Sequence, residues 1–211
     1  MRVMAVLSYT LIATLIARTV AGQERLAAVP PAAYTLEQQQ VVAQIAAGPR
    51  TEMFSPLLPM LRSPQLAYTA ERFGEYVYYS TAFDKRIYEL AVLLLARFTT
   101  QQYEWRVHYP QAIKAGIRSE DADAIAAGHR PPHLAADETI AYNFIIELYD
   151  RNEVSDVSYA QFIGAFGERG VVELVGLLGY YNTIALMMNV NRTPLNAGTT
   201  PLLLPLARPL P

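Results

Sequence analysis

The chain of 211 residues contains no cysteine. No disulfide can therefore hold the fold together, and no thiol can serve as a nucleophile or redox group, so stability must come from packing. Beyond residue 21 the chain also lacks an unbroken apolar run of the roughly 20 residues that cross a bilayer, because charged residues, glycine or asparagine interrupt the segments 92–96 and 171–188. We therefore expect a soluble mature protein without thiol chemistry.

The sequence also has no excess of positive charge, since it contains 17 Lys and Arg and 19 Asp and Glu.

The first 21 residues hold two arginines and no acid, and an apolar run precedes a stretch of small residues, as in a secretory signal peptide. An uncleaved anchor or an organelle transit peptide stays open, because Arg18 lies close to the expected cleavage point. Removal of residues 1–21 leaves 15 basic and 19 acidic residues, a net charge of −4, which argues against a nucleic-acid partner. We expect an exported protein, periplasmic or secreted, with no membrane contact once the leader is removed.

Apolar residues make up 52% of the sequence and recur at helical spacing, with no competing strand pattern. This periodicity predicts an all-α fold. We divide the chain into the leader 1–21, a linker and first helix over 22–54, a helical domain over 55–191, and a proline-rich arm over 192–211. The arm contains five prolines, which predict an extended segment. It is either a disordered tail or, as Leu202–Leu204 and Leu206 suggest, a segment that docks on a surface.

Capping signals set the helix boundaries. Thr35 with Gln38 reads as a capping box, and Ser63 before a proline marks the start of a helix over 64–79. Further helices are predicted from Asp84 to about 98, from Thr99 or Thr100 to Gly116, from Ser119 to 128, over 135–149, from Ser155 to about Gly167, and over 171–189.

Glu104 and His108 stand four residues apart in the helix predicted to end at Gly116, so they share one face of it. A carboxylate beside an imidazole favours the protonated ring and forms a proton-transfer pair. The same spacing is common on solvated helix surfaces, so spacing alone leaves an ordinary surface pair open.

Glu89 begins an apolar run of seven residues, where an unpaired charge would be costly to bury. It either pairs on the surface with Lys85 or Arg86 or takes part in a site. Arg97, eight residues further on, could balance Glu89 or bind an anionic substrate through a bidentate contact. Both interpretations stay open for both residues.

Several aromatic residues and two histidines are weaker candidates. Trp105 and the tyrosines at 76, 78, 79, 180 and 181 could line a pocket, although such residues are more often part of a core. His129 and His133 have a spacing seen in metal sites, but Pro131 and Pro132 prevent a helical pair and no carboxylate follows at a fixed offset. We therefore predict no metal.

The segment from Glu89 to Arg97, followed by Tyr103-Glu104-Trp105 and His108, resembles the helix pair that marks the carboxymuconolactone decarboxylase family. Further similarity lies at Ala112, at 115–117, at Glu120 and at 179–182, so the resemblance covers about residues 55 to 205. The related alkylhydroperoxidase branch carries two redox cysteines at the positions of Gln101 and Glu104. This chain has neither, which excludes dithiol peroxidase chemistry and favours the decarboxylase-type branch.

The resemblance implies an alkylhydroperoxidase-like bundle, in which two antiparallel helices present Glu89, Glu104 and His108 as catalytic groups to a small cavity. It also implies a homo-oligomer, a trimer or hexamer, and no cofactor. The expected reaction is decarboxylation of an anionic carboxylactone-like molecule, with His108 delivering a proton to the resulting carbanion. Glu104 would orient the imidazole and Glu89 would be a second proton carrier. Substrate contacts are expected from Arg97, Gln101, Tyr103 and Trp105.

Two functions from different classes remain. The first is a lyase or proton-transfer enzyme acting on a small lactone or organic acid. The second is a non-catalytic helical oligomer that binds a small hydrophobic ligand or a partner protein. The enzyme requires its two carboxylates and its imidazole to converge in one cavity, and divergent side chains would favour the binding protein.

Overall fold

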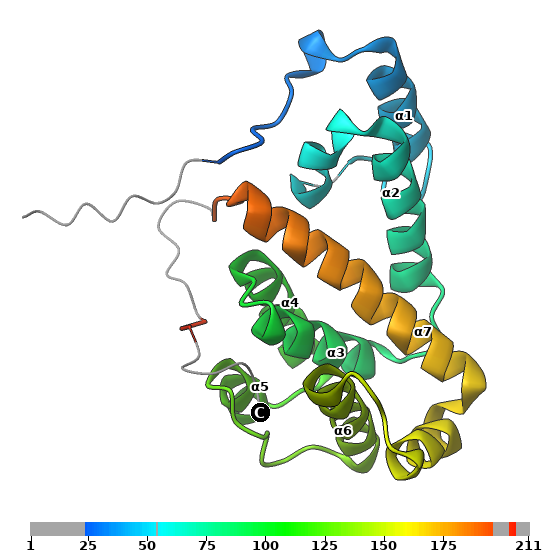
Figure 1. Cartoon of the computed structure of the whole chain (residues 1–211), viewed down its shortest axis with the longest axis vertical. Coiled ribbons are helices and arrows are strands. Elements are labelled where there is room, and N and C mark those ends of the chain that lie inside the picture. The colour runs from blue at the N-terminus through cyan, green and yellow to red at the C-terminus, as the bar shows by residue number, and fades with distance from the viewer. Residues whose placement is uncertain (1–23, 54, 196–202, 206–211) are drawn as a thin grey trace, which may run out of the picture.

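A computed structural model describes residues 24–53, 55–195 and 203–205. The predicted signal peptide lies outside these residues. The described part is all-α, with no strand, and Figure 1 shows α7 running between the α1–α2 pair and the group formed by α3 to α6. The elements are η1 (Pro31–Ala33), α1 (Leu36–Ala46), η2 (Ser55–Arg62), α2 (Pro64–Tyr79), α3 (Lys85–Phe98), α4 (Gln102–Ala115), α5 (Ser119–Ala126), α6 (Ala136–Arg151) and α7 (Asp156–Asn191).

The capping box predicted at the start of α1 is present. The Thr35 hydroxyl accepts from the backbone N–H of Gln38, and the Gln38 side chain accepts from the backbone N–H of Thr35. Asp84 caps α3 by accepting from the backbone N–H of Ile87 at 2.9 Å. Ser63 is the N-cap of α2 and Pro64 its first residue, as predicted, although the side chain of Ser63 makes no capping hydrogen bond.

The predicted start of α4 was also wrong. Thr99 and Thr100 were expected to begin the helix, but Thr99 ends α3 and Thr100 adopts φ 49°, a left-handed conformation that β-branched residues rarely take. Gln101 is the N-cap of α4, and its side chain accepts from the backbone N–H of Tyr103 at 2.7 Å. The three-residue turn folds α4 back against α3, which places the two helices side by side.

Helix α7 is divided at Gly167, whose φ of 70° and ψ of 175° are not helical. The sequence predicted a stop at this glycine, and its positive φ explains why a glycine stands there. By length and composition alone α7 could cross a membrane, and half of its most apolar window is buried inside the protein.

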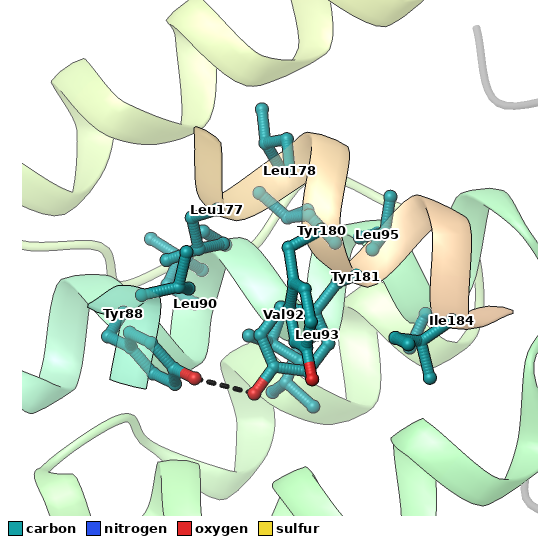
Figure 2. Packing of buried hydrophobic residues seen from close by; sticks show 14 of the residues in the cluster. Tyr88, Leu90, Val92, Leu93, Leu95, Leu177, Leu178, Tyr180, Tyr181 and Ile184 are labelled. Carbon is teal, nitrogen blue, oxygen red and sulfur yellow. Dashed lines mark hydrogen bonds between the residues drawn. The ribbon is translucent and has the colours of Figure 1, made fainter. Parts of the chain in front are cut away.

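The core lies where α3 packs against the second part of α7. Eleven consecutive residues of α3, from Ile87 to Arg97, are buried, so this helix is surrounded on all sides. Leu90 and Leu95 of α3 belong to one buried cluster with Leu177 and Ile184 of α7, part of which is drawn in Figure 2. Each fully buried leucine contributes roughly 1.5–3 kcal/mol to folding. The apolar run that begins at Glu89 is therefore the centre of the molecule, and this burial fixes where Glu89 can point.

The described part of the proline-rich arm docks on the α3–α4 turn. Leu203 is buried, and its backbone N–H and carbonyl both bond to the side chain of Gln102, at 3.1 and 2.5 Å. The carbonyl of Leu204 accepts from Arg97 at 2.9 Å. Of the two interpretations of the arm, docking therefore holds for residues 203–205.

Candidate functional site

Helices α3 and α4 bring two carboxylates onto the two nitrogens of one imidazole. The Nδ1 of His108 lies 2.7 Å from Oε2 of Glu89, and its Nε2 lies 3.3 Å from Oε2 of Glu104. All three side chains are buried, with residue exposures of 3–6%. The surface interpretations of Glu89 and of the Glu104–His108 pair are therefore wrong, because the turn at residues 99–101 folds both residues of α4 onto the buried face of α3.

The protonation of His108 follows from these contacts. Burial lowers the pKa of the ring, but hydrogen bonds and charge interactions with Glu104 and Glu89 outweigh it and raise the pKa to about 9. At neutral pH the ring is an imidazolium that donates one hydrogen bond to each carboxylate. The group is thus a proton donor at rest, and it becomes a base only after it has given its proton away.

Tyr181 of α7 contacts the imidazole, and Tyr88 of α3 contacts Tyr181. The ring of Tyr181 meets the ring of His108 edge-on at 5.2 Å between centroids. Its hydroxyl lies 2.5 Å from the hydroxyl of Tyr88, a contact drawn in Figure 2. Burial raises the pKa of Tyr181 well above its ordinary value, so this hydroxyl pair stays neutral. The contacts restrict the ring to one orientation.

These groups face a cavity of about 410 Å³, large enough for a small organic molecule. Its wall combines the loop after α1, the end of α2, and parts of α3, α4 and α7. It is lined by Pro49, Arg50, Glu52, Pro56, Tyr78, Tyr79, Glu89, Tyr103, Glu104, Val107, His108, Gln111, Tyr180, Tyr181 and Ile184.

The four predicted substrate contacts lie in different places. Tyr103 lines the cavity, as expected. Arg97 does not, because its guanidinium donates to the carbonyls of Ala126 and Leu204 and to the hydroxyl of Thr100. It holds the arm and the end of α5 in place, and substrate binding by Arg97 stays a prediction.

The other two predicted contacts also lie outside the cavity wall. The amide of Gln101 donates to Asn189 at 2.8 Å and ties α4 to α7. Trp105 is fully buried and stacks at a tilt against Tyr109. Both side chains are engaged by packing partners and are absent from the described wall, so substrate binding by Gln101 and Trp105 stays a prediction.

The tyrosines divide between the cavity and the surface. Tyr78, Tyr79, Tyr180 and Tyr181 line the cavity. Tyr76 instead donates to Glu173 on α7 at 2.8 Å. Tyr180 and Tyr181 of α7 are also buried, so these two residues both line the cavity and belong to the core.

Sequence reasoning missed Arg50 and Glu71. Arg50 follows the helix stop at 48–49 in a segment without periodicity, so no pattern singled it out. Glu71 does leave a signal, because Ala67, Glu71 and Gly74 follow helical spacing along one buried face of α2. Nε of Arg50 lies 3.2 Å from Oε1 of Glu71, although neither carboxylate oxygen of Glu71 accepts a well-directed hydrogen bond.

The described residues include no group of His, Cys, Asp and Glu side chains arranged to hold a metal ion. His129 and His133 are both exposed in the loop after α5.

The fold and the site together define a class of protein. It is a helical protein in which two carboxylates hold a buried imidazole beside a small cavity. Residues 64–145 match the model of the carboxymuconolactone decarboxylase family. The match includes Glu89, Glu104 and His108 but neither Arg50 nor α7. No curated protein and no solved structure matches the chain.

Proposed function

We propose that the protein is a lyase or proton-transfer enzyme that acts on a small lactone or organic acid, with His108 as its general acid. The observation that carries this proposal is the convergence of His108, Glu89 and Glu104 at the wall of one cavity. A binding protein that merely retained the scaffold would have no need to bury three ionisable groups together, which costs free energy.

In the proposed decarboxylation the substrate carboxylate leaves as carbon dioxide. The C–C bond breaks, its electron pair stays on the substrate carbon, and the imidazolium of His108 delivers a proton to that carbon. Solvent then returns a proton to the imidazole, so each turnover consumes one proton. The longer contact at Nε2 makes this nitrogen the donor, and the shorter contact at Nδ1 makes Glu89 the group that orients the ring. Glu104 would take the role of second proton carrier, which reverses the roles assigned from the sequence.

A homo-oligomer and an exported location stay predictions. The observation that favours an oligomer is an exposed apolar stripe along α7, formed by Val172, Val175, Leu186 and Val190. Such a stripe on a helix is typical of a surface that another chain covers.

The test of the enzymatic proposal is turnover. The mature protein would be incubated with a panel of carboxylactones and related acids, and products followed by mass. We expect carbon dioxide loss from at least one member, and a fall of about 10²–10⁴ in rate for His108→Gln. His133→Gln is the matched control, because it removes an exposed histidine outside the cavity and should keep full activity. Equal turnover in His108→Gln would refute the mechanism, and no product from any compound would favour the binding protein.

A further inference from the structure

The loop after α1 places an arginine in the wall of the candidate site. Arg50 lines the cavity together with His108, and its side chain is only 16% exposed. The next residue, Thr51, has φ 60°, so the loop turns sharply behind the arginine. This segment precedes the family domain, so the arginine is supplied by a part of the chain that the family match does not cover.

The contacts that position the guanidinium include an ion pair and a ring contact. Its Nε lies 3.2 Å from the carboxylate of Glu71, which is completely buried on α2. Its central carbon lies 5.7 Å from the ring centroid of Tyr78, in the range of a cation–π contact. A guanidinium carries five N–H donors in a planar fork, so an ion pair through Nε is compatible with a second carboxylate on the same group.

The charges around the cavity make this arginine important for a negatively charged ligand. Three carboxylates, Glu52, Glu89 and Glu104, line the described wall, and two of them are engaged by His108. Among the described wall residues, no lysine and no other arginine accompanies Arg50. An anion that entered without meeting Arg50 would face repulsion from the carboxylates.

We propose that Arg50 binds the carboxylate of a small organic acid in this cavity and thereby directs the substrate towards His108. This inference rests on the proposed function and names its substrate class. It gives to Arg50 the role that the sequence suggested for Arg97, whose guanidinium is occupied by backbone carbonyls of α5 and the arm. A substrate with two carboxylates fits both requirements, since the one held by Arg50 stays on the molecule while the other leaves as carbon dioxide from the carbon that His108 protonates.

The test compares an acid with its neutral analogue. Binding of 5-oxotetrahydrofuran-2-carboxylate and of the corresponding carboxamide to the full chain would be measured by calorimetry. The wild type should bind the carboxylate about 10- to 100-fold more tightly than the carboxamide, since a charge-assisted pair with Arg50 is lost in the neutral compound. Arg50→Gln should abolish this preference and leave carboxamide binding nearly unchanged.

A second variant separates binding from folding. Arg50→Gln alone leaves the buried carboxylate of Glu71 without its cation and so risks unfolding. The double variant Arg50→Gln with Glu71→Gln removes both charges and keeps both shapes, and it should show the same loss of acid preference. Arg72→Gln is the matched control, because Arg72 is 58% exposed, lies outside the cavity wall, and loses the same charge. It should keep the preference.

The outcomes distinguish this inference from the enzymatic proposal, because binding requires no turnover. No preference for the carboxylate in the wild type, or a preference that survives in the double variant, would overturn the role of Arg50 even if the panel were turned over. A preference that depends on Arg50 supports the inference, whether or not product forms.

Discussion

His108 is held by two acids from two helices, which changes what the ring can do. An imidazole in water is half protonated near pH 6.5 and serves equally as acid or base. Here the two carboxylates shift the pKa to about 9, so the ring is protonated at neutral pH. In the proposed reaction this ring would donate its proton to the carbanion of the substrate. This arrangement suits decarboxylation better than proton abstraction, in which the resting group must be neutral.

The same shift makes the stability of the protein depend on pH. The folded pKa of about 9 exceeds the unfolded value, so the folded state holds the proton more tightly. This contribution to stability is complete below pH about 6.5 and is lost as the pH rises through about 9. Its size is on the order of 3 kcal/mol. We expect the free energy of unfolding in urea to fall over this range in the wild type.

His108→Gln supplies the control for that decline. Without a titrating ring between the two acids, the variant should show a nearly flat free energy of unfolding between pH 6.5 and 9. Parallel curves for the two proteins would mean that the decline comes from other groups.

Part of the site could be predicted at the scale of single residues. The four-residue spacing of Glu104 and His108 follows from helix geometry, so their contact was foreseen. The apolar run marked Glu89 as a candidate, but its contact with His108 was foreseen only through the family resemblance, because the two residues are 19 positions apart. Arg50 was not foreseen, since its place in the wall depends on how a loop crosses the end of α2, and no local pattern encodes that path.

Helix ends were the most predictable feature at the scale of elements, and the exceptions have a physical cause. Gly116 and Gly167 end or divide helices with φ of 110° and 70°, as glycine permits. The turn between α3 and α4 was misplaced because Thr100 takes a left-handed conformation. Its hydroxyl accepts from Arg97 at 3.0 Å, so a tertiary bond offsets the local strain.

A pair of glycines on α2 and α7 tests how closely these helices pack. A side chain on Gly74 would collide with the hydroxyl and ring of Tyr180, which is buried in the cavity wall. Gly74→Ala should therefore lower the free energy of unfolding by about 1–3 kcal/mol, despite the better helix propensity of alanine. Chemical denaturation measures the change.

Gly179→Ala is the matched substitution on an exposed helix face, where nothing lies within 4 Å of the new methyl group. Its free energy of unfolding should rise by up to about 1 kcal/mol from helix propensity alone. A similar effect of the two substitutions, in either direction, would show that α2 and α7 do not meet through Tyr180.

The cavity is a property of the whole molecule. The segment that matches the family model, residues 64–145, supplies the acids and the imidazole, and the loop before it and α7 after it complete the described wall. The all-α class followed directly from periodicity and the absence of strand patterns. The path of α7 between the two groups of helices could not be predicted from the sequence. An amphipathic pattern shows which face of a helix is buried, but it does not show which other helix covers that face.

Nuclear magnetic resonance of the imidazole nitrogens, followed against pH in the full chain, tests this account most directly. The account predicts that both nitrogens of His108 carry protons at pH 7, that the ring titrates near pH 9, and that in urea its midpoint returns to about 6.5. A His108 ring that is neutral at pH 7 in the folded protein, with a midpoint at or below 6.5, would contradict it.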